Sequence, residues 1–151
     1  MLRLRIPPLI LVLLVAWAMF LTAFKVPIAL VDVPLRELIS AVSALSGCGC
    51  AVLGVMQCHR AQTTVDPRIP EQTSQLVTTG IYQYSRNPMY VGFLLILVGW
   101  GIFLSNYAAL VWLPVFVLYL NTQQIKPEEE ALLSKFQDEY SKYCKKVRRW
   151  I

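Results

Sequence analysis

Two apolar runs separated by two polar residues decide the fold class: MYVGFLLILVGWGIFL at residues 89–104, Ser105 and Asn106, then YAALVWLPVFVLYL at residues 107–120. Neither run contains a charged side chain, and both are rich in residues that bilayer hydrocarbon accepts. Because only Ser105 and Asn106 separate them, we expect a tight helical hairpin. Each run is shorter than the roughly 20 residues that cross a bilayer. Tilted, re-entrant or interface-extended helices therefore remain open.

Two further apolar runs precede this hairpin, at residues 9–24 and 38–57. The first follows two arginines and two prolines, and prolines are tolerated in the first turn of a helix. Its charged start is similar to a secretory signal, but the later apolar runs argue against cleavage. The second run has about the length of a span. Small residues recur in it at a spacing of four, which favours close helix packing: Ser43, Gly47 and Ala51 on one stripe, and Ser46, Cys50 and Gly54 on the next.

Composition supports a membrane protein of one domain. The chain has 151 residues, of which 56% are hydrophobic and 15% charged, which is too apolar for an ordinary soluble domain. We expect a single domain over residues 1–151, with two N-terminal spans in residues 1–57 and a cofactor-binding loop, hairpin and tail in residues 58–151. The formal net charge of +5 requires no nucleic acid partner, because the basic residues flank the apolar runs.

The cysteines and the single histidine predict neither a metal site nor a disulfide framework. Cys48, Cys50, Cys58 and Cys144 do not form two CxxC pairs. His59 stands beside Cys58, but a second pair of ligands at a familiar spacing is missing. We expect structural thiols and no metal.

The distribution of basic residues predicts the topology. When both termini and the polar stretch 58–85 lie on one side, only Lys25 and Arg36 remain on the other. The positive-inside rule then selects about four transmembrane helices with both termini in the cytoplasm. We expect the inner membrane of a bacterial-type cell.

The chain changes character after residue 120. We expect Asn121 to Gln124 to leave the membrane and Pro127 to start a new helix, with acidic residues in its first turn. Apolar residues then recur at helical spacing, which predicts a C-terminal cytoplasmic amphipathic helix: Leu132, Leu133, Phe136, Tyr140 and Tyr143. The basic residues after it are expected to contact anionic lipid head groups: Lys145, Lys146, Arg148 and Arg149.

The hairpin brings two polar clusters together at one end of the apolar runs. The first contains Tyr82, Tyr84, Arg86, Asn87 and Tyr90, and the second Glu128, Glu129 and Glu130. A pocket with charged and aromatic walls suits a polar, zwitterionic ligand. Other interpretations stay open, because tyrosines are common at membrane interfaces, Arg86 can be a snorkelling anchor, and glutamates suit a first helical turn.

The residues around these clusters carry a resemblance. The first motif is Gly80-x-Tyr82-x-x-Ser85-Arg86-Asn87-Pro88-Met89-Tyr90-x-Gly92. The second is Glu128-Glu129-x-x-Leu132-x-x-x-Phe136-x-x-Glu139-Tyr140-x-x-Tyr143-x-x-x-Val147-x-Arg149. Together they resemble the isoprenylcysteine carboxyl methyltransferase and phospholipid methyltransferase family over roughly the C-terminal half. Thr63, Thr64 and Pro67 resemble a weaker upstream element.

The resemblance implies an all-α integral membrane enzyme that takes S-adenosylmethionine from the cytoplasm and a lipophilic or small acceptor from the bilayer. It nominates as catalytic Arg86, Asn87, Tyr90 and Glu129. The cofactor-binding set that it implies is Tyr82, Arg86, Asn87, Pro88, Tyr90, Gly92, Glu128 and Glu129. Asn87 stands where the family usually has histidine, and an amide cannot remove a proton near neutral pH. An acceptor that is already a carboxylate or thiolate is therefore favoured.

Two other function classes are open on the sequence. One is a non-catalytic membrane module whose pocket binds a lipid or a partner, with Asn87 marking lost chemistry. The other is a membrane reductase of the steroid-reductase type, which would bind a nicotinamide cofactor.

Overall fold

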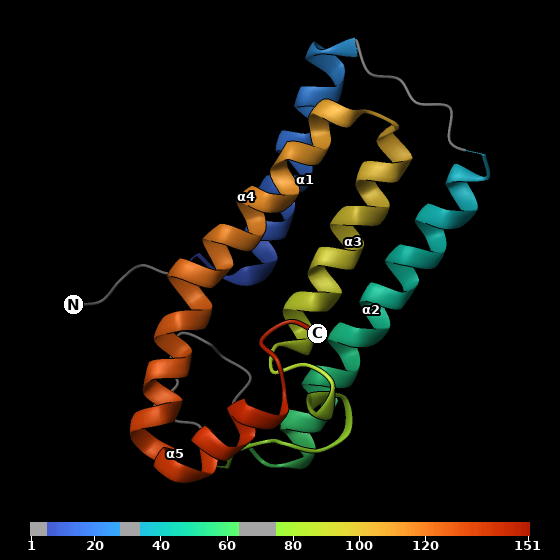
Figure 1. Cartoon of the computed structure of the whole chain (residues 1–151). Helices are drawn as coiled ribbons and strands as arrows, with labels where there is room; N and C mark the ends of the chain where they lie inside the picture. Colours follow the sequence, from blue (N-terminus) through green and yellow to red (C-terminus); the bar gives the residue numbers. More distant parts are fainter. Residues whose placement is uncertain (1–5, 28–33, 64–74) are drawn as a thin grey trace.

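The computed structural model describes residues 6–27, 34–63 and 75–151, and the described part is helical with no β-strand (Figure 1). Thr64 and Pro67 of the weaker motif lie outside the described residues. In chain order the elements are α1 (Pro8–Lys25), α2 (Arg36–Arg60), η3 (Gly80–Gln83), α3 (Pro88–Leu104), η4 (Tyr107–Val111), α4 (Trp112–Tyr119), η5 (Leu120–Ile125) and α5 (Lys126–Lys146). The all-helical fold predicted from the apolar runs is confirmed.

Three helices of the described chain are long and apolar enough to cross a membrane: Pro8–Lys25, Arg36–Arg60 and the continuous helix Tyr107–Lys146. The fourth apolar helix, α3, has 17 residues and is shorter than these. Large apolar side chains of α1 and α2 are exposed on the faces turned away from the neighbouring helices, as hydrocarbon requires. The chain is an integral membrane protein.

Helix α3 stands between α1 and α2 and packs closely on α2 through glycines. A Cβ on Gly47 would lie 2.5 Å from the carbonyl oxygen of Gly92, and a Cβ on Gly92 would lie 2.5 Å from that of Gly47. Only residues without a side chain allow this approach. The first small-residue stripe therefore packs as predicted. In the second stripe Gly54 packs on Met89, whereas Ser46 is exposed.

The chain turns at Ser105 and Asn106, as the sequence predicts. Ser105 ends α3 in the left-handed conformation, with φ 51°. Asn106 opens η4, because its Oδ1 accepts from the N–H of Ala109 at 3.2 Å. Its Nδ2 donates to the carbonyl of Val26 at 2.8 Å, which ties the turn to the end of α1.

Helix α2 extends past the apolar run at residues 38–57 into the polar stretch that begins at Cys58. Helix α2 continues to Arg60, so Cys58 and His59 are helical. No proline or glycine interrupts residues 55–61, and the N–H of Ala61 still bonds the carbonyl of Gln57 at 3.0 Å. Helix α2 therefore extends about one turn beyond the end of the apolar run at residue 57.

The expected helix start at Pro127 is wrong. The helix that begins at residue 107 continues through Pro127 to the kink at Gln137, and its segment Leu120–Ile125 is a π-helix. A proline inside a helix lacks an N–H and crowds the preceding turn. The wider π turn before Pro127 accommodates the proline without ending the helix.

The direction of the chain changes instead at Gln137, which has φ 42° and ψ −113° inside α5. We call residues 126–136 the outgoing limb and residues 138–146 the return limb. The return limb folds back beside the outgoing limb (Figure 1). Leu132 and Phe136 of the outgoing limb pack against Tyr140 and Tyr143 of the return limb. The segment predicted to be one amphipathic helix is therefore two limbs that meet at Gln137 and pack on each other through these apolar residues.

Candidate active site

A glycine turn brings the first polar cluster to the end of α2. Gly80 has φ +60°, a conformation that favours glycine, and the side chain of Gln57 lies against it. The short helix η3 follows and buries Tyr82. Pro88 then begins α3, which leaves Arg86 just before its first turn.

An ion-pair network joins Arg86 to α5 and to the C-terminal tail. Nη2 of Arg86 lies 3.1 Å from Oε1 of Glu129. Arg149 binds both oxygens of the same carboxylate. Its Nε donates to Oε1 at 3.0 Å, and its Nη2 donates to Oε2 at 2.6 Å. The side chains of Arg86, Glu129 and Arg149 are 13%, 17% and 33% exposed. Glu129 thus holds two cations in a largely dry setting.

The backbone of the tail completes the same corner. The N–H of Arg86 donates to the carbonyl of Arg148 at 3.1 Å. Nδ2 of Asn87 donates to the carbonyl of Arg149 at 2.9 Å. Nε1 of Trp150 donates to Oδ1 of Asn121 at 3.1 Å, which anchors the tail on η5. The tail is therefore part of the site wall.

Arg149 is a site residue that the sequence reasoning assigned elsewhere. It was expected to contact lipid head groups together with its basic neighbours, whereas the structure pairs it with Glu129. This hydrogen bond raises the pKa of the Arg149 guanidinium above its already high value, so Arg149 stays charged. The signal was present, because the second motif includes Val147-x-Arg149.

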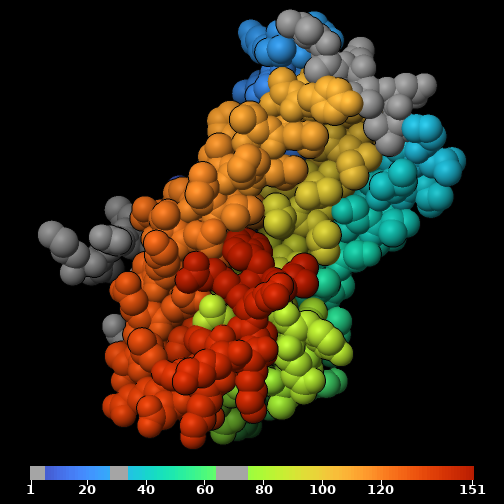
Figure 2. Space-filling view, in the orientation of Figure 1, coloured from blue at the N-terminus to red at the C-terminus, as the bar shows by residue number. Residues whose placement is uncertain are grey.

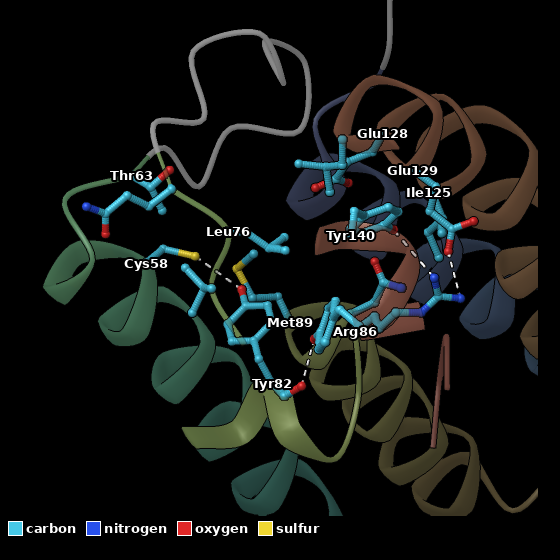
Figure 3. A pocket seen from close by; sticks show the side chains of 15 residues that line it. Cys58, Thr63, Leu76, Tyr82, Arg86, Met89, Ile125, Glu128, Glu129 and Tyr140 are labelled. Atoms are coloured by element: carbon cyan, nitrogen blue, oxygen red, sulfur yellow. Dashed lines mark hydrogen bonds and ion pairs between the residues drawn. The ribbon is translucent and has the colours of Figure 1, made fainter. Parts of the chain in front are cut away.

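A cavity of about 80 Å³ lies beside this network (Figure 3). One side comes from the end of α2 and the segment before η3, with Cys58, Thr63 and Leu76. The other side comes from η5 and the outgoing limb, with Glu128 and Glu129. Further lining residues are Gln75, Val77, Tyr82, Arg86, Asn87, Met89, Ile125, Leu132, Tyr140 and Tyr143. The wall is thus aromatic and apolar, with charge concentrated on one side.

Arg86 offers one unsatisfied donor in this setting. Its Nη1 contacts Sγ of Cys144 and lies 3.5 Å from the hydroxyl of Tyr140, and its Nη2 pairs with Glu129. Its Nε is buried and has no hydrogen-bond partner in the described part of the chain. A buried donor of this kind is costly unless a ligand or water satisfies it.

Tyr82 is held firmly at the cavity wall. Its hydroxyl lies 3.2 Å from Sγ of Cys58, and its carbonyl accepts from the hydroxyl of Tyr143 at 2.6 Å. Burial raises the pKa of the Tyr82 phenol far above its usual value, and the nearby Cys58 and Glu128 add to the rise. Tyr82 therefore stays protonated near neutral pH.

The structure separates the predicted site residues into two groups. Tyr82, Arg86, Asn87, Glu128 and Glu129 line the cavity. The remaining three contribute to its frame and do not line it: Pro88 starts α3, Tyr90 is buried with its hydroxyl 3.5 Å from Oε2 of Glu128, and Gly92 packs on α2. Of the open alternatives, Tyr84 suits an interfacial aromatic, because it is exposed.

A second cavity, of about 480 Å³, lies between the two limbs of α5. It shares Arg86, Glu129 and Tyr140 with the first cavity, so these side chains stand between the two. Lys126 and Lys145 add positive charge to it. Figure 2 shows a hollow between the orange and red parts of α5 at this place. No group of three or more potential metal ligands occurs among the described residues.

Comparison with known proteins supports the family that the two sequence motifs resemble. Residues 35–139 match the family described as phospholipid methyltransferase. A segment of 63 residues, 42% of this chain, is 48% identical to an uncharacterized protein of Haemophilus influenzae over all of that protein's length. The chain is also similar to protein-S-isoprenylcysteine O-methyltransferases of two yeasts. Identity is 40% over 72 residues for Schizosaccharomyces pombe (48% of this chain, 30% of that protein) and 38% over 78 residues for Saccharomyces cerevisiae (51% and 32%).

The matched region therefore spans about a third of the length of these two yeast relatives. No solved structure matches the chain.

Proposed function

Because this chain belongs to the phospholipid methyltransferase family, we propose that it is a membrane methyltransferase that uses S-adenosylmethionine. The acceptor that we propose is a lipophilic or small molecule whose reacting group is a carboxylate or thiolate. The names of the yeast relatives describe O-methylation of a protein-linked isoprenylcysteine, which supports an acceptor oxygen on a lipid-bearing molecule.

The observation that carries the proposal is the Arg86–Glu129–Arg149 network at the cavity wall. S-adenosylmethionine has an amino-acid head, a sulfonium cation and an adenosine. The positively charged guanidinium of Arg86, which lines the cavity, suits its carboxylate, and Glu128 suits its ammonium. Tyr82 and Tyr140 provide aromatic surface for a cation. The donor set therefore fits the cofactor.

The size of the site requires both cavities. The first, at about 80 Å³, is smaller than the roughly 300–1,000 Å³ of ordinary ligand pockets. The second cavity has about 480 Å³ and shares Arg86, Glu129 and Tyr140 with the first. We propose that a movement of the Tyr140 side chain joins the two cavities around the ligand, while Arg86 and Glu129 stay paired.

The remaining chemistry follows from what the chain's residues can do. When bound, the cofactor supplies an electrophilic methyl group. Methyl transfer is an in-line displacement, so the main demand on the protein is alignment of the reactants and exclusion of water. Arg149 and the tail carbonyls fix Glu129, Arg86 and Asn87 for this purpose.

The wall offers little general-base chemistry, which supports an anionic acceptor. Tyr82 is held protonated by burial, and the Asn87 amide cannot take a proton. Glu128 and Glu129 are the carboxylates of the cavity wall, and Glu129 is engaged by two guanidiniums. An acceptor that arrives as a carboxylate or thiolate needs no proton removed.

We further propose that α3 is a fourth span and that both termini face the cytoplasm of a bacterial-type cell. The support is the charge distribution, since Lys25 and Arg36 are the basic residues at the end of the helices opposite Arg86. The site then opens to the cytoplasm, where the cofactor is available.

Calorimetric titration of the detergent-purified protein with S-adenosylmethionine tests the proposal. We expect binding by the wild type, and loss of binding in Arg86→Ala and Glu129→Ala although both variants remain folded. Asp138→Asn, an exposed change on the return limb, is the control and should bind normally. Wild-type affinity in both alanine variants would overturn the site assignment. Incubating membranes with methyl-labelled cofactor and identifying the labelled product would then define the acceptor, and no transfer to any lipid or protein would contradict the activity.

A further inference from the structure

Trp150 of the tail makes a contact outside the cavities of the candidate active site. Its Nε1 donates to Oδ1 of Asn121 at 3.1 Å, and its ring packs against the main apolar core. Both side chains are partly buried. Neither is among the described residues that line the two cavities that share Arg86. The pair can therefore act on the site only through other residues.

Two neighbouring side chains of the tail bind two separate turns of one helix. Trp150 reaches Asn121, and Arg149 binds both carboxylate oxygens of Glu129. Positions 121 and 129 are about 12 Å apart along a helix, at 1.5 Å per residue. Figure 2 shows the red end of the chain against the orange part of this helix. The tail is thus attached to the helix at two points, and each attachment limits the movement of the other.

Asn121 belongs to the π turn that orients Glu129. The N–H of Lys126 bonds the carbonyl of Asn121, which is the i→i+5 bond of a π turn. Such a turn holds about one residue more than an α turn, and one residue corresponds to about 100° around the helix axis. The direction in which Glu129 leaves the helix therefore depends on the π turn. Since the side chain of Asn121 accepts from Trp150, the tail also holds the residue that starts this turn.

Trp150 stands next to the backbone that holds Arg86 and Asn87. The carbonyl of Arg148 accepts from the N–H of Arg86 at 3.1 Å, and the carbonyl of Arg149 accepts from Nδ2 of Asn87 at 2.9 Å. This part of the tail forms no helix or strand, so its position depends on contacts of this kind. Loss of the Trp150 bond should therefore loosen both carbonyls.

We propose that Asn121 and Trp150 are a pair of positioning residues for the candidate active site. Their hydrogen bond fixes the tail on the π turn, so that Arg149 meets Glu129 and Arg86 is held at the cavity wall. The role of the pair in methyl transfer rests on the proposed function, whereas its effect on the position of Arg86 does not.

Hydrogen exchange of the detergent-purified protein without cofactor tests the positioning. Trp150→Phe keeps an aromatic ring and removes the N–H, and Asn121→Leu keeps the size and removes the acceptor. In both variants the backbone N–H of Arg86, which bonds the tail, should exchange about 3–10-fold faster, as expected for the loss of one hydrogen bond. The matched controls are Trp17→Phe and Gln123→Leu, on exposed faces of α1 and η5, and they should exchange at the wild-type rate.

Calorimetric titration with S-adenosylmethionine tests the consequence for the site. Trp150→Phe and Asn121→Leu should each bind about 3–10-fold more weakly. The double variant should bind no more weakly than the worse single variant, because the two changes remove the same interaction. Asn121→Asp retains an acceptor oxygen and should keep wild-type affinity and exchange, which a role of side-chain bulk alone would not predict. Asn121→Ala replaces Asn121→Leu if the larger apolar side chain prevents folding.

The outcomes distinguish this pairing from the proposed function. Wild-type exchange at Arg86 in both single variants would overturn the pairing, and so would unchanged cofactor affinity or additive losses in the double variant. Effects of Trp150→Phe without any effect of Asn121→Leu would also overturn it, because Trp150 would then be an interfacial aromatic anchor. A wild type that binds no S-adenosylmethionine, together with the expected changes in exchange, would refute the proposed function and support the pairing.

Discussion

Glu129→Gln is the sharpest test of the candidate site, because it keeps the shape of the side chain and removes its charge. Glu129, on helix α5, forms ion pairs with Arg86, which lies just before α3, and with Arg149 of the tail. Glutamine can still accept with one oxygen, but it turns an amide N–H₂ toward a guanidinium. We expect the variant to lose both stability and cofactor affinity.

The magnitude follows from burial. Hydrogen bonds to charged groups contribute about 1.5–3 kcal/mol each. Removing one partner of a fully buried pair costs about 3–5 kcal/mol. Arg86 is 13% exposed and comes near this limit, whereas Arg149 is 33% exposed and can turn to water. We therefore expect a loss of about 2–3 kcal/mol in the free energy of unfolding. In the variant, Arg86 loses the charged partner that holds it in place. We therefore expect S-adenosylmethionine to bind about 10–100-fold more weakly, which equals about 1.4–2.7 kcal/mol.

Two measurements separate these effects. Denaturant unfolding in detergent, followed by tryptophan fluorescence, reports stability, and calorimetric titration at a temperature where both proteins are folded reports affinity. The control is Asp138→Asn, which makes the same carboxylate-to-amide change on an exposed part of the return limb. A Glu129→Gln protein within about 0.5 kcal/mol of wild type would refute the energetic argument. Lost stability with an unchanged dissociation constant would show that the network is structural only.

Three other substitutions test the framework of the site. Gly47→Leu should abolish α2–α3 packing and folded protein on size exclusion, whereas Gly49→Leu should be neutral because a Cβ there meets nothing within 4 Å; equal behaviour of the two would contradict the packing argument. Gln137→Gly should raise the free energy of unfolding, measured by thermal denaturation, by about 1 kcal/mol, because glycine adopts the positive φ without strain. Ser134→Gly in the regular helix should lower it by about 0.5 kcal/mol. A destabilised Gln137→Gly protein would contradict the kink at this residue. Asn87→Ala should cost about 1 kcal/mol and speed hydrogen exchange in the tail, and unchanged exchange would rule out its bond to the tail carbonyl.

The parts of the fold that depend on local pattern could be predicted. The hairpin turn needs only Ser105 and Asn106 between two apolar runs, and α1 begins at a proline pair. The close α2–α3 packing follows from small residues at a spacing of four. In each case the cause lies within a few residues of the effect.

The parts that depend on tertiary contacts could not. Pro127 normally indicates a helix start, but the π turn before it keeps the helix continuous. Gln137 carries no glycine or proline signal, yet it takes the positive φ that reverses α5. Packing of Leu132 against Tyr143 across the kink stabilises this conformation, and no local rule anticipates such a contact.

The same distinction explains the candidate site. The approach of Arg86 to Glu129 follows from the hairpin and was expected. Arg149 was assigned to lipid contact because basic residues at the end of a membrane protein usually suit head groups. Its actual partner depends on the reversal at Gln137, which carries the tail back to α3.

The tail also satisfies hydrogen-bond donors at the start of α3. The N–H groups before and at the start of a helix have no partner inside it and must be satisfied from outside. The N–H of Arg86 and the amide of Asn87 find the carbonyls of Arg148 and Arg149, so the tail satisfies donors that would otherwise compete for a ligand. Side chains of α5 take the two terminal nitrogens of the Arg86 guanidinium, because Nη2 pairs with Glu129 and Nη1 contacts Tyr140 and Cys144. Within the described part of the chain, Nε of Arg86 is the donor that neither the tail nor α5 satisfies.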